Sequence, residues 1–234
     1  MATTRTSPAP ARRRGRVARL LRWCVTLILG AWLAVASSLV ALRWFAPPFT
    51  AVQIERRLQA QLQGKPYRKR CAFVPLASVS PDLQHAVVAA EDTRFYLHHG
   101  FDWVEIRNAV EDDLDDRRVR GASTITQQLV KNLFFGTGHS YLRKGLEASL
   151  VPVAEVTLGK RRILELYLNV VEWGPGVYGA EAAARYHYST AARSIGRVQA
   201  LRLAAVLPSP LRRRPERMTA YSAIIDGRMR QMGW

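Results

Sequence analysis

Acidic and cationic residues recur in three segments of the chain, at spacings that could build one reactive site. The segments are residues 91–100, 121–132 and 143–147. The first opens on the carboxylate pair Glu91 and Asp92, and the third ends on Glu147. A carboxylate can act as a general base, and cations stabilise negative charge on a departing group. Together the segments predict an acid–base site with an anion-binding wall.

Glu91 is the strongest candidate for the base. It ends a stretch with apolar residues at helical spacing and precedes Phe95 and Phe101. A carboxylate beside apolar side chains loses solvation, so its pKa rises toward the range of a useful base. The alternative is a solvated glutamate at a helix end. Asp92 could be a turn residue, and His98 could bind a neighbouring side chain or only pack.

The third segment places its charges on one helix face. Arg143 and Glu147 are four residues apart, and Lys144 and Glu147 are three apart. An exposed salt-bridged face, which adds little stability, is the alternative interpretation.

The second segment predicts a helix start that could hold an anion. Ser123 and Thr124 precede a helix on which Gln128 and Lys131 share a face. Unpaired backbone amides and hydroxyls at a helix start attract anions. Ordinary helix capping explains the same residues, so this segment alone does not decide.

These segments must be positioned by helices. Apolar residues recur at helical spacing, and helix-start signals stand at Ser80-Pro81-Asp82, at Asp102 with Glu105, and at Thr124 with Gln127. No alternating strand of useful length occurs, so the predicted class is mostly α. Pro152 is expected to kink or break a helix. The expected helices are residues 51–62, 80–91, 102–114, 124–133, 140–157, 160–172, 178–186, 195–207 and 221–232.

A membrane anchor is predicted near the N-terminus. Residues 23–42 are uncharged and lie between Arg22 and Arg43. Twenty helical residues span about 30 Å, the thickness of the apolar core of a bilayer. Trp23 and Trp44 lie at its ends, where such rings favour the interface. Seven arginines precede it, so we expect a cytoplasmic N-terminus and an external body.

Two other readings of this segment stay open. The small residues 34–36 could form a signal-peptide cleavage site, although the apolar run continues past them. A buried core helix is the third reading, and the arginine cluster on one side argues against it.

Composition limits the class of protein. The 234 residues suffice for one domain plus an anchor, and 48% are hydrophobic, which supports a packed core. The formal charge of +17 favours an anionic partner such as lipid headgroups, a phosphate substrate or nucleic acid. Cys24 and Cys71 are not expected to pair, because one lies in the anchor.

In the order and the residues of its motifs, the chain resembles the biosynthetic peptidoglycan glycosyltransferases of glycosyltransferase family 51. The matching segments are Glu91-Asp92-x-x-Phe95-x-x-His98-x-Gly100, Gly121-Ala122-Ser123-Thr124-Ile125-Thr126-Gln127-Gln128-x-x-Lys131-Asn132, Arg143-Lys144-x-x-Glu147, a fourth around residues 162–179 and a fifth at residues 182–184. The resemblance covers residues 20–234 and is greatest to the monofunctional subgroup. His187-Tyr188 and Ala191 depart from the usual fifth motif, in a region of packing.

The resemblance implies a lysozyme-like helical fold and an inverting transfer with lipid II as substrate. Glu91 would be the base and Glu147 a second catalytic carboxylate that orients cations. The implied substrate-binding residues are Asp92, Phe95, His98, Ser123, Thr124, Gln128, Lys131, Asn132, Arg143 and Lys144. No cofactor is required by this expectation, and a divalent ion, Mg²⁺ or Mn²⁺, is possible near Glu147.

The implied partners are lipid II, the growing glycan strand and membrane lipid, together with possible proteins of cell-wall synthesis or division, and no nucleic acid. The expected location is the bacterial inner membrane, with a single span and a periplasmic catalytic domain. Transpeptidase activity is not expected, because no Ser-x-x-Lys occurs. The expected divisions are a basic tail (1–22, disordered), the anchor (23–42), a juxtamembrane segment (43–70) and the catalytic domain (71–234).

Two rival functions remain at this point. A lysozyme-like hydrolase would share the catalytic glutamate but would need a protonated acid for its sugar leaving group, and would gain nothing from the cations. A non-enzymatic basic membrane protein would bind nucleic acid or anionic lipid in a salt-dependent way.

Overall fold

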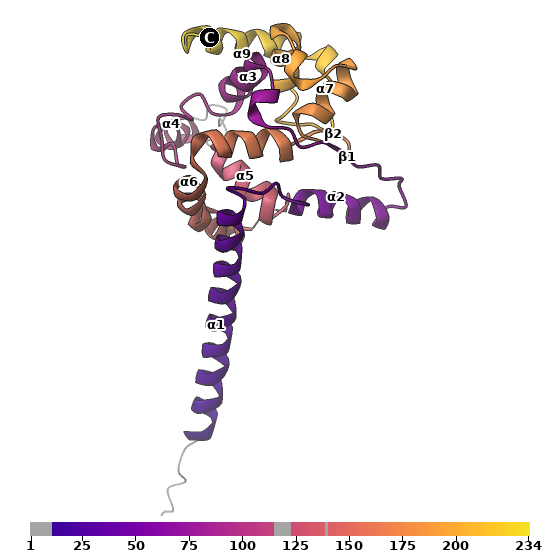
Figure 1. The fold of residues 1–234 in the computed structure, drawn as a ribbon. Helices are drawn as coiled ribbons and strands as arrows, with labels where there is room; N and C mark the ends of the chain where they lie inside the picture. Colours follow the sequence, from indigo (N-terminus) through magenta and orange to yellow (C-terminus); the bar gives the residue numbers. More distant parts are fainter. Residues whose placement is uncertain (1–10, 115–122, 139) are drawn as a thin grey trace, which may run out of the picture. The chain divides into compact units, whose positions relative to one another are not determined.

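The structure is a computed structural model that describes residues 11–114, 123–138 and 140–234 (Figure 1). The chain divides into two units, residues 1–38 and 39–234. Gly121 and Ala122 of the second motif lie outside the described residues.

Helix α1 (Ala11–Ala41) contains the predicted anchor. Its segment Ala18–Ala41 has the length and apolar composition needed to cross a membrane. The expected disorder of the basic tail is wrong from Ala11 onward, because alanine, arginine and leucine are good helix formers and the helix continues through them. Residues 1–10 lie outside the described part of the chain.

The predicted helix starts are confirmed at the first two helices of the body. Helix α2 (Ala51–Leu62) has the expected bounds, and the Thr50 hydroxyl accepts a hydrogen bond from the Gln53 amide. A short turn of 3₁₀ helix, η1 (Leu76–Ser78), precedes α3. Helix α3 (Pro81–Glu91) begins after Ser80, whose hydroxyl accepts from the Leu83 amide at 3.1 Å.

The next two helices also begin where the sequence predicts. Asp102 caps α4 (Trp103–Leu114), because its Oδ1 accepts from the amides of Val104 and Glu105, both at 3.1 Å. Thr124 and Gln127 form a capping box at the start of α5 (Ile125–Phe134).

Helix α6 (Tyr141–Val170) corrects the prediction about Pro152. The residue with non-helical backbone angles is Gly159 (φ 70°, ψ 162°), whereas Pro152 lies inside the helix. A positive φ is open to glycine at little cost, so the chain changes direction there. The two predicted helices at 140–157 and 160–172 are therefore the two arms of α6 on either side of Gly159.

A small sheet was not predicted. It contains β1 (Arg70–Cys71), β2 (Glu172–Gly174) and β3 (Val177–Tyr178), in the order β1-β3-β2. β3 pairs in parallel with β1 and antiparallel with β2. Strands of two or three residues are too short to produce an alternating pattern, so the sequence gives no signal for them.

The remaining helices complete the body. They are α7 (Ala180–Tyr188), η2 (Ala192–Ser194), α8 (Arg197–Ala204), η3 (Pro215–Arg217) and α9 (Thr219–Gln231). Helix α8 is shorter than the predicted range 195–207, and α9 begins and ends slightly before the predicted range 221–232. The mostly α class is confirmed.

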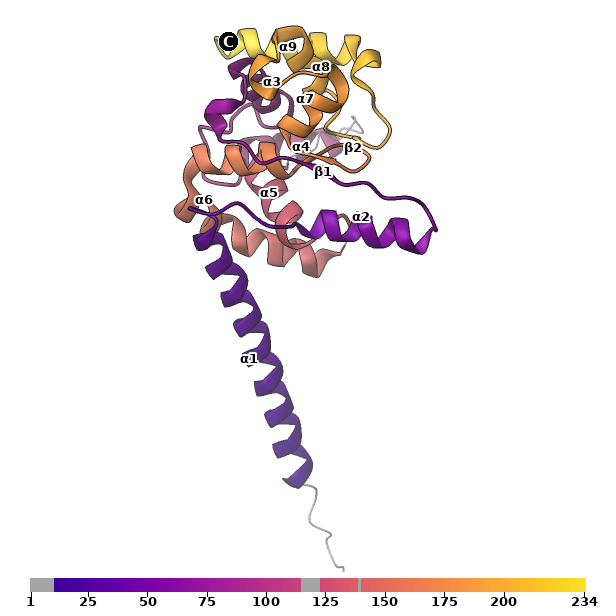
Figure 2. The same cartoon turned by 45° about the vertical axis from the view of Figure 1, so that its right-hand side comes forward.

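Two groups of helices pack around the core of the body. Helix α3 packs against α8 and α9 at one end, and α5 packs against α6 and α2 (Figures 1 and 2). Leu83 and Val87 of α3, Leu129 of α5 and Leu164 of α6 are almost completely buried in the core. Glu91, the last residue of α3, and the start of α5 lie where these two groups meet.

Candidate active site

A chain of hydrogen bonds holds the Glu91 carboxylate. The Gln128 amide on α5 donates from Nε2 to Glu91 Oε2 at 2.8 Å. The Tyr167 hydroxyl on α6 donates to Gln128 Oε1, also at 2.8 Å. Glu91 Oε1 is buried and has no hydrogen-bond partner among the described residues. One carboxylate oxygen is thus fixed by the protein and the other is unpaired.

Burial raises the pKa of Glu91 above its ordinary value, as the sequence predicted. The hydrogen bond from Gln128 and the positive charges of Lys131 and Arg213 act in the opposite direction, and Asp92 adds to the rise. Burial and the Glu91 carboxylate also raise the pKa of Tyr167 well above its ordinary value, so this hydroxyl remains a donor. Because Tyr167 donates to Oε1 of Gln128, the Nε2 group of that amide faces Glu91.

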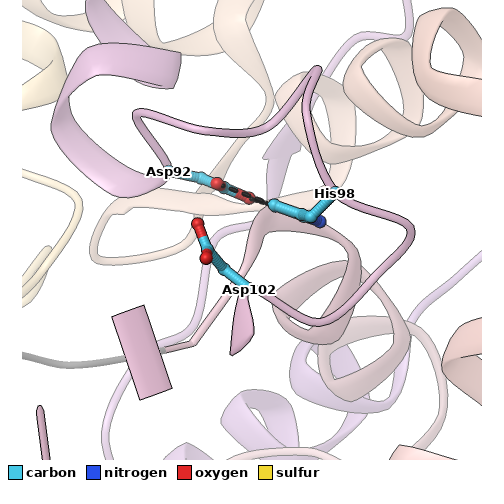
Figure 3. Close-up of side chains that lie close together, drawn as sticks. All are labelled: Asp92, His98 and Asp102. Carbon is cyan, nitrogen blue, oxygen red and sulfur yellow. Dashed lines mark hydrogen bonds and ion pairs between the residues drawn. The ribbon is translucent and has the colours of Figure 1, made fainter. Parts of the chain in front are cut away.

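Asp92 joins the first and second motifs. His98 Nε2 lies 3.0 Å from each carboxylate oxygen of Asp92, and the Ile125 amide donates to Asp92 Oδ2 at 3.0 Å (Figure 3). The Asp92 carboxylate therefore ties the end of α3 to the first turn of α5. That link sets the distance between Glu91 and Gln128.

Gly100 completes the same link. Its amide donates to His98 Nδ1 at 3.1 Å, and its carbonyl accepts from the Thr124 hydroxyl at 2.7 Å. Gly100 has φ 97°, and a Cβ at this position would collide with the Val151 side chain on α6. The requirement for glycine here is both conformational and steric.

Asp92, His98 and Asp102 form a buried group whose ligand-type atoms lie within 4.8 Å of one another. In Figure 3 the Asp102 carboxylate points toward that of Asp92. These atoms already have partners: Asp102 Oδ2 lies 3.1 Å from Arg94 Nε, and its Oδ1 caps α4. Within the described part of the chain, this is the one such group that could hold a metal ion, and it does not include Glu147.

Glu147 lies instead among positive charges. The buried Glu147 carboxylate is 3.0 Å from Arg143 Nε and 3.7 Å from Lys144 Nζ. Burial lowers the pKa of Lys131, while Glu147 and Glu91 act to keep that lysine charged. We call Lys131, Arg143 and Lys144 with Glu147 the cation cluster. A divalent ion near Glu147 stays a prediction.

A cavity of about 480 Å³ opens beside Glu91. Its lining includes five residues that the sequence predicted for the site: Glu91, Asp92, Ser123, Thr124 and Gln128. The cation cluster is not part of this lining within the described residues. It adjoins the cavity through α5, which carries Gln128 toward Glu91 and also carries Lys131, whose charge acts on Glu91. The one reactive site that the sequence predicts is therefore built from two adjoining parts, a cavity and the cation cluster.

Three other predicted site residues are held inside the protein. Phe95 is fully buried and packs edge-on against Tyr96, with Lys160 over its ring, so its contacts are those of a core residue. His98 is buried against Asp92. Asn132 donates to the Gln128 carbonyl at 2.7 Å, which fixes the backbone of α5. In this structure these side chains support the site, and a direct substrate contact by them remains a prediction.

Several residues of the site have no sequence signal that predicts their role. Tyr167 was hidden in an apolar helix stripe, where its hydroxyl gives no separate signal. Tyr221 and Arg228 line the cavity from α9, more than a hundred residues after Glu91. Asp102 and Glu105 were recognised only as helix-start residues, and they line the cavity too.

Comparison with known proteins relates the chain to one family. Residues 56–231 match the transglycosylase family. The chain is 47% identical over 208 residues to the biosynthetic peptidoglycan transglycosylase of Pseudomonas fluorescens (strain SBW25), covering 86% of this chain and 87% of the relative. It is 42% identical over 221 residues to the protein of the same name from Shewanella oneidensis (strain MR-1, ATCC 700550), covering 93% and 94%.

Proposed function

The chain belongs to the transglycosylase family, and on that premise we propose that it polymerises lipid II into glycan strands. The observation that carries the proposal is the buried Glu91 carboxylate, which lines the cavity, has one oxygen without a partner among the described residues and is acted on by the charge of Lys131. Peptidoglycan transglycosylase activity in cell-wall synthesis follows from the family and the relatives.

The proposed reaction uses both parts of the site. Glu91 takes the proton from the C4 hydroxyl of the acceptor sugar, whose oxygen bonds to the anomeric carbon of the growing strand. The bond between that carbon and the lipid diphosphate breaks, and the electron pair leaves with the diphosphate. Attack from the face opposite the leaving group inverts the anomeric centre, as in inverting hydrolases.

The cation cluster supplies what a diphosphate leaving group needs. Negative charge grows on the phosphate oxygen as the bond breaks, and Lys131, Arg143 and Lys144 would stabilise it. Glu147 holds two of these cations, at 3.0 Å and 3.7 Å. A diphosphate is already a good leaving group, so the mechanism needs no strong general acid.

A resident metal ion is not part of this proposal. The Asp92, His98 and Asp102 group contains the oxygen and nitrogen ligands that suit Mn²⁺, and these residues would hold such an ion there. An ion there would compete with the hydrogen bonds between His98 and Asp92 and with the ion pair between Asp102 and Arg94. We therefore assign this group to positioning Glu91.

The test of the proposal is direct. Purified full-length protein in detergent is incubated with lipid II, and in a separate reaction with finished glycan strands. Polymer formation with release of undecaprenyl diphosphate supports the proposal. Cleavage of the finished strands without synthesis would instead support a hydrolase. The polymer should contain no peptide cross-links, because no Ser-x-x-Lys is present for a transpeptidase.

The pH dependence should report the titration of Glu91. Its pKa is raised above the ordinary value of 4.5, so the carboxylate form, which acts as the base, is lost at a higher pH than for a solvated glutamate. We expect kcat/KM to fall as the pH drops through an acid limb whose midpoint lies above 4.5. Initial rates of polymerisation between pH 4 and 9 measure this limb. A rate independent of pH down to the ordinary glutamate value would contradict the assignment.

We also propose that α1 anchors the protein in the inner membrane with residues 39–234 outside the cytoplasm. Cys71 is an exposed free thiol in the body, and Cys24 lies within the apolar segment of α1. A membrane-impermeant maleimide added to intact spheroplasts should therefore label Cys71. A Cys71→Ser variant should lose the label. Labelling only after the cells are lysed would reverse the proposed orientation.

A further inference from the structure

Helix α9 packs beside α3, the helix that ends at Glu91 (Figures 1 and 2). From α9, Arg228 Nη1 donates to the carbonyl oxygens of Ala89 at 3.2 Å and Ala90 at 3.3 Å. These are the two residues before Glu91. Arg228 also lines the cavity with Glu91.

The contact satisfies a need of α3. The last carbonyl groups of a helix have no amide donor within the helix, and they carry partial negative charge. The Asp92 amide donates a hydrogen bond to the carbonyl oxygen of Val88, one turn earlier, at 2.9 Å. The carbonyls of Ala89 and Ala90 receive the Arg228 guanidinium instead. A cation at the carboxyl end of a helix is also electrostatically favourable.

The Glu91 side chain is therefore held from two directions. Gln128 fixes one carboxylate oxygen from α5, and Asp92 ties the following residue to the start of that helix. Arg228 fixes the backbone immediately before Glu91. Without Arg228, the last turn of α3 would keep its hydrogen bonds to α5 but lose the two hydrogen bonds from the guanidinium on α9.

We propose that Arg228 is a positioning residue for the transfer reaction, which aligns the Glu91 carboxylate with the acceptor hydroxyl by fixing the last turn of α3. The inference rests on the proposed function, since it assigns Glu91 as the base. In this proposal Arg228 acts on Glu91 through the backbone of residues 89 and 90. A displacement of about 1 Å in a reacting group can lower a rate about 100-fold.

The division of the loss between kcat and KM gives the proposal a readout that a purely structural role lacks. A residue that only stabilises the fold lowers the melting temperature and leaves the kcat of the folded enzyme unchanged. A residue that aligns the base lowers kcat and leaves KM unchanged.

The experiment compares Arg228→Met, Arg228→Lys and Arg230→Met with wild type in lipid II polymerisation. Arg230 is the matched control, because it lies on the same helix, is 70% exposed and pairs with Asp226 on the surface. We expect Arg228→Met to lower kcat about 10- to 100-fold with KM within about twofold of wild type. Arg228→Lys keeps the charge and a donor for the two carbonyl groups, so it should recover part of kcat. Arg230→Met should match wild type.

Three results would overturn the proposal. Unchanged kcat with only a lower melting temperature would make Arg228 a stabilising residue alone. A raised KM with unchanged kcat would make it a substrate contact. If Arg228→Met does not fold, Arg228→Ala takes its place, and a folded Arg228→Ala variant with wild-type kcat and KM would refute the proposal. The wild-type reaction distinguishes failure of the proposed function from failure of this inference. An inactive wild type refutes the proposed function. An active wild type whose kcat and KM equal those of Arg228→Met refutes only the role of Arg228.

Discussion

Glu91→Gln is expected to lower the rate of lipid II polymerisation about 10²- to 10⁴-fold, the range that a positioned general base contributes. The amide cannot accept the proton from the acceptor hydroxyl. Its shape is almost that of glutamate, and its oxygen can still accept the hydrogen bond from Gln128. The rate of polymer formation from lipid II measures the loss directly. The residual activity should lack the acid limb of the wild type.

The same substitution should leave the protein at least as stable as wild type at neutral pH. A carboxyl group with a raised folded-state pKa binds its proton more tightly in the folded protein. Folding is then favoured by this group below its unfolded pKa, and that advantage is lost as the pH rises to the folded pKa. Glutamine carries no charge and so avoids this loss. Thermal unfolding in detergent at pH 5 and pH 8 measures the difference.

The control for this prediction is Glu216→Gln, which neutralises an exposed glutamate in η3. Its polymerisation rate should equal that of wild type. If Glu91→Gln polymerises lipid II as fast as this control, Glu91 is not the base. If it is slow only because it is unfolded, the unfolding measurements identify that cause.

Local signals in the sequence predicted the frame of the site well. Ser80 and Thr124 each mark a helix start through a side-chain oxygen that accepts from an amide three residues later. Such signals depend on neighbours in sequence, so they are visible without the fold. The position of Glu91 at the end of an apolar helix follows in the same way, and so does the rise in its pKa.

Features that depend on distant contacts could not be predicted. Arg228 contacts the carbonyl groups of Ala89 and Ala90, which precede it in the chain by 139 and 138 positions. Tyr167 occupies an apolar position of its helix, and the sequence does not predict that its hydroxyl donates to Gln128. Local rules predict the break in α6 at Pro152, but the helix continues through the proline and Gly159 adopts the positive φ at which the backbone angles are non-helical.

The separation between the cavity and the cation cluster also needed the structure. Sequence spacing placed Arg143 and Glu147 on one face, and the structure confirms their contact at 3.0 Å. The spacing could not show that, among the described residues, this face is not part of the cavity lining. Two parts with different chemistry suit a reaction in which one sugar gives up a proton and the other loses a diphosphate.

Lys131→Met is the second substitution with a large expected effect. Loss of one preorganised group that stabilises charge in the transition state lowers kcat about 10²- to 10³-fold. Lys131 is the member of the cation cluster whose charge acts on both Glu91 and Glu147. Methionine fills a similar volume without the charge, so packing is preserved. Measured kcat and KM for lipid II should show the loss mainly in kcat, because the charge on the diphosphate grows as the bond breaks.

Lys131→Met should also move the acid limb to higher pH, because Lys131 lowers the pKa of Glu91 in the wild type. Lys65→Met, at an exposed lysine outside the site, is the matched control and should change neither kcat nor the acid limb.

Glu147→Gln combined with Lys131→Met tests how the second carboxylate works. If Glu147 acts by holding the cations, the double variant should lose less than the product of the two single losses. A rise in KM alone would mean that Lys131 binds the substrate without stabilising the departing diphosphate.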